Sequence, residues 1–138
     1  MNQAQILDAL AGLSLFSDLD RPQLQAVAHT MSEESFPAGQ RILRQGFSGG
    51  GFFVILEGEV SVHVDGGEVA ALGKGDFFGE ISLLLGEPPV ADVVASTPVH
   101  ALQLAGPDLR EFLLAYPVVM YRMLQAVSRR LERANRRS

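Results

Sequence analysis

The chain has 138 residues, of which 47% are hydrophobic, and it carries a formal net charge of −5. This length and composition predict a single domain over residues 1–138 with a core of its own. The lack of cysteine excludes a disulfide framework and a thiolate zinc site. No apolar run is long enough to span a membrane, and no basic leader precedes an apolar segment. We therefore expect a cytoplasmic protein without membrane contact.

The charge is unevenly distributed along the chain. Residues 122–138 hold six arginines and one acidic residue, whereas residues 1–121 hold five basic and fifteen acidic residues. The acidic balance of the whole chain disfavours nucleic-acid binding. The arginine-rich end is compatible with nucleic-acid contact, but no recognition helix or aromatic platform accompanies it. A solvated helix face is the favoured interpretation, and no nucleic-acid partner is expected.

Two short helices are predicted at the N-terminus. Residues 3–11 place apolar side chains at helical spacing, and a short apolar segment follows at residues 13–16. Asp20 is a good N-cap for a second helix, because Pro22 then falls in its first turn. Residues 35–43 are typical of a strand, a turn and the start of another strand.

From residue 51 the apolar period becomes two. The segment VSVHV at residues 60–64 alternates apolar and polar side chains, which predicts a strand. Glycine-rich turns separate it from its neighbours, and two more strands are predicted at residues 90–95 and 99–104. Short strands at near-regular spacing predict a mainly β fold, a small barrel or jelly roll over about residues 35–105.

Two further helices are predicted over about residues 107–137. Pro117 ends or kinks the first of them. The second, residues 118–137, carries an apolar seam with spacings of four, three and four residues, as in a short coiled coil. The seam consists of Met120, Leu124, Val127 and Leu131. Such a seam would be exposed on an isolated helix, so we expect a homodimer through this helix.

The stretch from Gly75 to Val94 organises the rest of the chain. Gly79 permits a close backbone approach or a positive φ. Residues 80–85 predict one or two helical turns, which Gly86 and the two following prolines stop. The free N–H groups at the start of such a turn are a candidate anion site.

The segment Phe78-Gly79-Glu80-Ile81-Ser82-Leu83 resembles the first half of the phosphate-binding cassette of the cyclic-nucleotide-binding domain family. Further segments of the chain resemble other motifs of that family and occur in the same order: residues 13–16, 37–40, 42–46, 53–60, 116–117 and 128–131. The similarity is to the sensor domain of catabolite-activator-type regulators. It implies an eight-stranded jelly roll, or double-stranded β-helix, with flanking helices. Because the chain stops at Ser138, we expect a stand-alone sensor domain without the DNA-binding domain of that branch.

The resemblance also implies a ligand site for cyclic AMP or cyclic GMP. Glu80 would accept the ribose 2′-OH, and within the matched motif this role is favoured over that of a solvated or capping glutamate. Ser82 would hold phosphate oxygens, although a serine there is equally typical of a local helix cap. The base would meet the long helix near Ala134 and Asn135. The full set of residues implied is Phe78, Gly79, Glu80, Ile81, Ser82, Pro89, Val90, Ala91 and Asn135.

The second half of the cassette departs from the family pattern. The arginine that grips the cyclic phosphate falls on Pro89, and no Lys or Arg occurs between Lys74 and Arg110. Loss of the cationic half of a desolvated pair costs roughly 3–5 kcal/mol. We therefore expect dissociation constants for cyclic nucleotides on the order of tens of micromolar or weaker, or a different small ligand. Arg41, Arg44 or a partner's arginine would replace the missing group only if the fold brings it close.

Two other classes of function compete with a ligand sensor. The first is a protein-interaction or dimerisation module that keeps the fold and binds no ligand. The second is a metal-dependent jelly-roll enzyme, which the isolated positions of His29, His63 and His100 disfavour. No set of nucleophile, base and orienting group is visible. We expect a protein that is not an enzyme, requires no cofactor and has no metal site.

Overall fold

The computed structural model describes residues 1–47 and 50–137. Residues 48–49, which fall within the range expected for the jelly roll, and residue 138 lie outside the described residues. The N-terminal part is helical, with α1 (Gln3–Ala11), a 3-10 turn η1 (Ser14–Phe16) and α2 (Arg21–Thr30). Asp20 caps α2 as expected, since its carboxylate accepts a hydrogen bond from the Gln23 backbone N–H at 2.9 Å.

Eight strands follow and form two four-stranded antiparallel sheets. The first sheet has the order β1-β8-β3-β6, and the second has the order β2-β7-β4-β5. This arrangement confirms the eight-stranded jelly roll. The bounds are β1 (Ser32–Phe36), β2 (Arg41–Leu43), β3 (Gly51–Glu57), β4 (Val60–Val64), β5 (Gly67–Leu72), β6 (Phe77–Phe78), β7 (Asp92–Ala95) and β8 (Val99–Ala105).

The central strand β3 is buried on both faces. Phe52, Val54 and Leu56 pack into a large core shared with the helices, whereas Phe53 and Ile55 pack into a smaller core between the sheets. The continuous apolar run GFFVIL follows from this position, because each face of the strand meets a hydrophobic layer. A strand of a half-solvated sheet would instead alternate apolar and polar residues, as β4 does.

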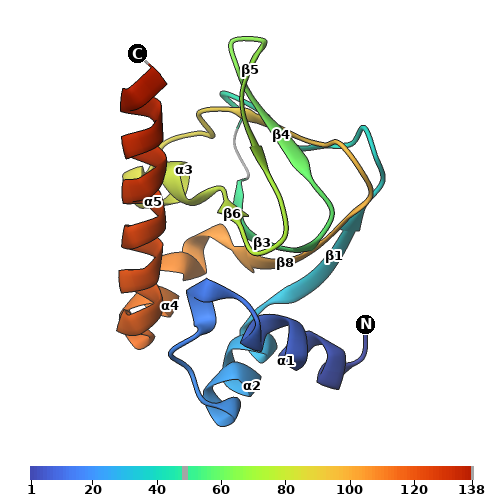
Figure 1. The fold of residues 1–138 in the computed structure, drawn as a ribbon, viewed down its shortest axis with the longest axis vertical. Helices are drawn as coiled ribbons and strands as arrows, with labels where there is room; N and C mark the ends of the chain where they lie inside the picture. Colours follow the sequence, from blue (N-terminus) through green and yellow to red (C-terminus); the bar gives the residue numbers. More distant parts are fainter. Residues whose placement is uncertain (48–49, 138) are drawn as a thin grey trace.

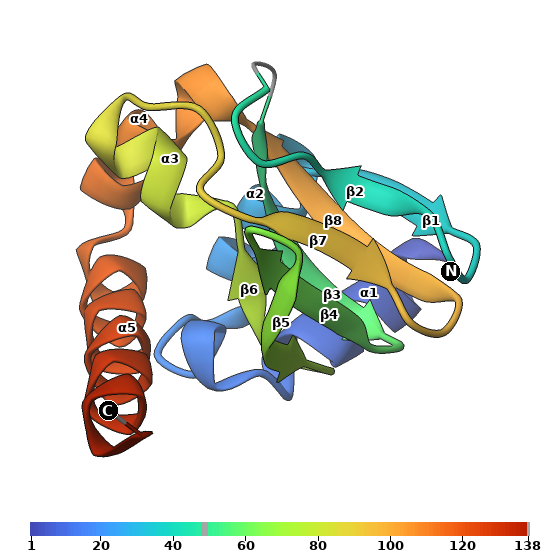
Figure 2. The same cartoon turned by 90° about the horizontal axis from the view of Figure 1, so that it is seen from above.

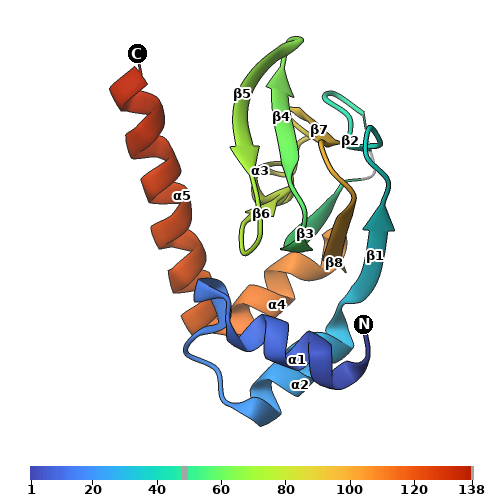
Figure 3. The same cartoon turned by 45° about the vertical axis from the view of Figure 1, so that its right-hand side comes forward.

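A single short helix, α3 (Glu80–Leu85), interrupts the strands within the described residues, as predicted. After β8, a 3-10 turn η2 (Gly106–Asp108) leads into α4 (Leu109–Ala115) and then α5 (Pro117–Arg137). In Figure 1, α5 runs along the side of the jelly roll. Figure 2 shows α3 and α5 on the same side of the sheets. Figure 3 shows α1 and α2 below the sheets, near the first turns of α5.

Helix α5 is held mainly through its first half. Val119 and Met123 are buried in the large core, at 0% and 3% exposure. Arg122 also makes two hydrogen bonds to the carboxylate of Asp18, at 2.8 and 3.0 Å. The Arg122 guanidinium lowers the pKa of Asp18. The anchored first half fixes where the second half of α5 meets the cassette.

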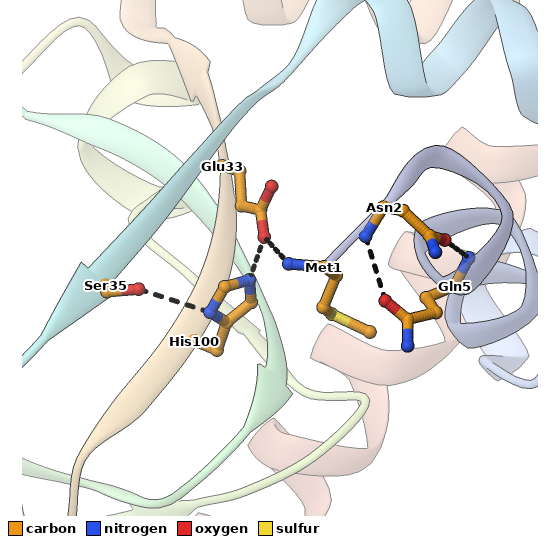
Figure 4. Close-up of polar contacts among 6 residues, drawn as sticks. All are labelled: Met1, Asn2, Gln5, Glu33, Ser35 and His100. Carbon is orange, nitrogen blue, oxygen red and sulfur yellow. Dashed lines mark hydrogen bonds and ion pairs between the residues drawn. The ribbon is translucent and has the colours of Figure 1, made fainter.

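The start of the chain is tied to the first sheet by a polar cluster (Figure 4). The amino group of Met1 donates to the carboxylate of Glu33 on β1 at 2.9 Å. The same carboxylate contacts Nε2 of His100 on β8, whose Nδ1 lies 3.2 Å from the Ser35 hydroxyl. The hydrogen bond from the Met1 amino group, together with His100, lowers the pKa of Glu33, against the opposing effect of burial. This cluster joins α1 to the β1–β8 pair.

Candidate functional site

The cassette starts on β6, whose two phenylalanines face opposite ways. Phe77 belongs to the large core, and Phe78 stacks on Phe53 of β3 with ring centroids 4.9 Å apart. The next residue, Gly79, has a φ of +93°. A Cβ at Gly79 would lie 1.9 Å from the carbonyl oxygen of Gly51, so no other residue fits without moving β3. Glycine at this position lets the chain turn sharply from β6 into α3.

Helix α3 begins directly at Glu80 and buries two polar side chains. Glu80 is 3% exposed and Ser82 is 4% exposed. The Ser82 hydroxyl donates to the Gly79 carbonyl at 3.3 Å. This is not a helix-cap contact, because a capping oxygen accepts from a backbone N–H, and α3 has no side-chain cap. The apolar side chains of α3 instead face outward, with Ile81, Leu84 and Leu85 between 46% and 63% exposed.

A cavity of about 350 Å³, here called the cassette cavity, lies between α3, α5 and the second sheet. Eight of the nine residues expected from the sequence line it. The lining residues not expected are contributed by β2, β4, β5, β7 and α5: Leu43, Val62, Ala70, Leu72, Val93, Val127, Arg130 and Leu131. Among the described lining residues, only Glu80 and Arg130 are ionisable.

Asn135 lies outside the cassette cavity. It borders a separate hollow on α5 with Ser128, Leu131, Glu132 and Arg136. The expected contact between Asn135 and the base stays a prediction, and the helix residues that do line the cassette cavity lie nearer to the start of α5. The first half of α5 is fixed in the core, and so the helix passes the mouth of the cavity at Val127, Arg130 and Leu131. These three positions share one face at i, i+3 and i+4.

Arg130 is the residue that sequence reasoning missed. Its Nη1 donates to Oε1 of Glu80 at 2.9 Å, and its Nη2 donates to the carbonyl oxygen of Phe77 at 2.6 Å. The guanidinium carbon lies 4.3 Å from the centroid of the Phe77 ring, within the range of a cation–π contact. The sequence had offered Arg41, Arg44 or a partner's arginine as a guanidinium near the cassette, whereas α5 supplies one from fifty residues away.

The electrostatics of Glu80 are set by this contact. Burial raises the pKa of Glu80, and the positive charge of Arg130 opposes the rise. The Glu80 side chain is 5% exposed and that of Arg130 is 27% exposed, so water screens the pair only from one side. The two charged groups described in the cavity are therefore bound to each other, so the pair presents no net charge to a ligand.

The two arginines named as replacements for the missing one lie elsewhere. Arg41 has its Nε 4.0 Å from the carboxylate of Asp92, and the guanidinium of Arg44 lies 5.8 Å from the ring centroid of Phe47. Neither lines the cassette cavity. Pro89 does line it and is buried, in the position where the family's phosphate-binding arginine was aligned.

The described residues offer little to other classes of site. No group of three or more His, Asp or Glu side chains among them is placed to hold a metal ion. No described helix is both long enough and apolar enough to cross a membrane. What remains is a mostly apolar cavity in a jelly roll, covered by a C-terminal helix. A cavity of this size and apolar lining is typical of a small-ligand site.

Comparison with known proteins makes this class specific. The model of the family described as "Cyclic nucleotide-binding domain" matches residues 33–116. The chain belongs to the cyclic nucleotide-binding domain family. The family expected from the sequence is confirmed, and with it the regulatory type of fold.

Among curated proteins, the chain is similar to the cGMP-dependent protein kinase egl-4 of Caenorhabditis briggsae. The two are 37% identical over 101 residues, which is 69% of this chain and 14% of the kinase. The chain thus spans a small part of the length of that relative. Among solved structures, the catabolite activator protein of Thermus thermophilus is 28% identical with a TM-score of 0.76, covering 88% of this chain and 60% of that chain.

Two kinase regulatory subunits are also similar. The regulatory subunit of a cAMP-independent protein kinase A from Trypanosoma brucei is 31% identical with a TM-score of 0.79, covering 91% of this chain and 45% of that chain. A triple mutant of it, in which one threonine becomes arginine, was solved bound to cAMP in its A site. The corresponding subunit from Trypanosoma cruzi, solved bound to guanosine, is 30% identical with a TM-score of 0.72, covering 84% of this chain and 42% of that chain.

Proposed function

We propose that this chain is a regulatory sensor domain whose cassette cavity takes an uncharged nucleoside-like ligand in preference to a cyclic nucleotide. The observation that carries the proposal is the pairing of the only two charged groups described in the cavity. A cyclic phosphate would meet Pro89 and apolar side chains, while the Arg130 guanidinium is already bound to Glu80 and the Phe77 carbonyl.

The free energies favour a neutral ligand. A phosphate that enters an apolar cavity must lose water, and this costs several kcal/mol unless a cation pairs with it. Arg130 would pair with it only by sharing its charge between the phosphate and the buried Glu80 carboxylate, or by giving up its contact with Glu80. A base and ribose need no such exchange, and an apolar cavity of about 350 Å³ is within the size range of small-ligand sites. The kinase subunits described above support the same interpretation, since one belongs to a cAMP-independent protein kinase A and the other was solved bound to guanosine.

The test is a calorimetric titration with guanosine, adenosine, cyclic AMP and cyclic GMP. For the unmodified chain we expect dissociation constants for both cyclic nucleotides on the order of tens of micromolar or weaker, with little discrimination between them. At least one nucleoside should bind more tightly than its cyclic nucleotide. Nanomolar binding of cyclic AMP would overturn the proposal, since it would show that Arg130 or another arginine takes the phosphate.

The informative substitution is Pro89→Arg. It returns a guanidinium to the cavity and should tighten both cyclic nucleotides at least tenfold, while leaving nucleoside binding within a factor of about three. Pro88→Arg is the matched control, because Pro88 is exposed and does not line the cavity. Equal gains from the two variants would show a general charge effect and would contradict the assignment of Pro89 to the phosphate position.

Dimerisation through the helix 118–137 is a second part of the proposal. Met120, Leu124 and Leu131 are 39%, 59% and 63% exposed, although Val127 and Leu131 also border the cassette cavity. Ile81 of α3, which is exposed and lines the same cavity, adds to the apolar area open to a second copy or to another protein. If no nucleoside or cyclic nucleotide binds at millimolar concentration, the ligand-free interaction module becomes the better description. The same proposal includes a regulatory rather than a catalytic role, and a location in the cytoplasm.

A further inference from the structure

A second cavity, of about 320 Å³, lies where α5 meets η1 and the turn before β6. Four arginines of α5 line it, and it is here called the arginine cavity: Arg122, Arg129, Arg130 and Arg133. Its other lining includes Ser14, Gln125 and Asp76. Arg130 is the only described residue that borders both this cavity and the cassette cavity.

Helical spacing explains why the arginines gather. Arg122, Arg129 and Arg133 are separated by seven and four residues, so they lie on one face of α5. Like charges at i and i+4 repel each other and destabilise a helix, and Arg129 and Arg133 have this spacing. A bound anion would remove that repulsion, whereas an empty cavity leaves it in place.

The existing ion pairs leave two of the four arginines without a partner. Arg122 is bound to Asp18, and Arg130 is bound to Glu80. Arg129 and Arg133 make no ion pair or hydrogen bond with any residue that the structure describes. The nearby Glu132 is 3.3 Å from Arg136 instead.

The one carboxylate that lines the cavity is also engaged. Asp76 accepts a hydrogen bond from the Gly73 N–H at 2.9 Å, which holds it in the turn before β6. It faces four guanidinium groups, two of which are paired to other carboxylates. The cavity therefore retains a net positive charge inside a concavity bounded by three elements.

Guanidinium groups present planar forks of N–H donors that match phosphate oxygens. Two unpartnered forks one helical turn apart favour an anion with more than one phosphoryl group over a monovalent ion. Neutral donors are also present in the lining, from the Gln125 amide and the Ser14 hydroxyl. We propose that the arginine cavity binds a small polyphosphate, either inorganic or carried on a nucleotide. The site is separate from the ligand proposed for the cassette cavity and does not depend on it.

The test is calorimetric titration of the full chain with inorganic pyrophosphate at constant ionic strength, followed by adenosine diphosphate. We expect saturable one-to-one binding of pyrophosphate that weakens as salt is raised. Similar affinities for both probes would show that the phosphates suffice, and tighter binding of adenosine diphosphate would show that the nucleoside adds contacts; either result supports the site. No saturable binding of either probe would overturn it.

Two double variants with equal charge make the test specific. Arg129→Gln with Arg133→Gln should weaken pyrophosphate binding at least tenfold. Arg110→Gln with Arg136→Gln removes the same charge outside the cavity and should change binding less than threefold. Equal losses in the two would overturn the site in favour of nonspecific attraction to a basic surface. Arg129 and Arg133 make no described ion pair or hydrogen bond, and the Arg136–Glu132 pair is exposed to solvent. Both proteins should therefore fold, and far-ultraviolet circular dichroism checks this directly.

Discussion

The contact between Arg130 and Glu80 makes a sharp prediction about stability. Replacing Arg130 by Met removes a charge-assisted hydrogen bond to Glu80, a hydrogen bond to the Phe77 carbonyl and a cation–π contact with the Phe77 ring. It also leaves the Glu80 carboxylate buried without a cation. Breaking a fully buried pair in this way costs roughly 3–5 kcal/mol.

The expected loss is smaller than that limit. The Arg130 side chain is 27% exposed, so water replaces part of the lost interaction. We expect Arg130→Met to reduce the free energy of unfolding by about 2–3 kcal/mol at pH 7.5. Arg129→Met is the matched control on the neighbouring residue and should cost less than about 0.5 kcal/mol, because Arg129 makes no described contact.

The loss should depend on pH. Burial raises the pKa of Glu80, and removing Arg130 takes away the charge that opposes the rise. Between the ordinary glutamate pKa and the raised value, the folded state holds more protons than the unfolded state, so stability falls as pH rises. The penalty of Arg130→Met should therefore be largest above the raised pKa of Glu80 and should shrink as pH is lowered toward 4.5, the ordinary value.

Urea unfolding at pH 7.5 and pH 5.5, followed by circular dichroism, measures these differences. A double-mutant cycle with Glu80→Gln isolates the pair, and Arg130→Met should cost less than about 1 kcal/mol when Glu80→Gln is already present. A penalty under 1 kcal/mol at pH 7.5, or one that is the same in both backgrounds and at both pH values, would refute the reasoning.

Three further predictions concern the backbone, acid stability and assembly. Gly79→Ala should destabilise the fold by more than about 3 kcal/mol, whereas Gly86→Ala, with φ +68° but nothing within 4 Å of the added Cβ, should cost about 1 kcal/mol in the same urea assay. Asp18→Asn should lower the thermal midpoint at pH 7 and not at pH 2, because the contribution of a carboxylate with a lowered pKa is lost as pH falls below its ordinary value of 3.8. In sedimentation experiments the chain should dimerise more strongly at higher salt, because salt screens the charges of Arg129 and Arg133. Leu124→Glu should abolish the dimer. A monomer at high micromolar concentration, unchanged by this substitution, would contradict the assembly.

Local patterns predicted much of the fold. Three predictions depended only on a few neighbouring residues: the helix at residues 3–11, the N-cap Asp20 and the strand at residues 60–64. The structure has a helix, a cap and a strand at these places. Strand bounds were less predictable. The strand expected from residue 90 begins at Asp92, because Pro89, Val90 and Ala91 line the cassette cavity instead of joining the sheet.

The candidate site was only half predictable, because its other half comes from distant elements. The motif at residues 78–82 could be recognised, since those residues are contiguous. Nothing local distinguishes Arg130 from Arg129 as the arginine that reaches Glu80. The available signal was the helical spacing, which places Arg130 on the same face as Val127 and Leu131. The sequence had assigned Val127 and Leu131 to a dimer contact, but both also border the cavity.

The uneven anchoring of α5 gives this helix the mechanics of a lever. Val119 and Met123 are its buried pivot. Arg130 lies seven residues further along, about 10 Å at the helical rise per residue, and Arg136 lies about 20 Å from the pivot. A tilt of about 10° would move Arg130 by about 2 Å and the far end by about 3.5 Å. The first displacement suffices to break a hydrogen bond of 2.9 Å to Glu80. The larger displacement, at the end of the helix, would shift any contact made there. A small change in the cavity is therefore enlarged along α5 without any strand having to move.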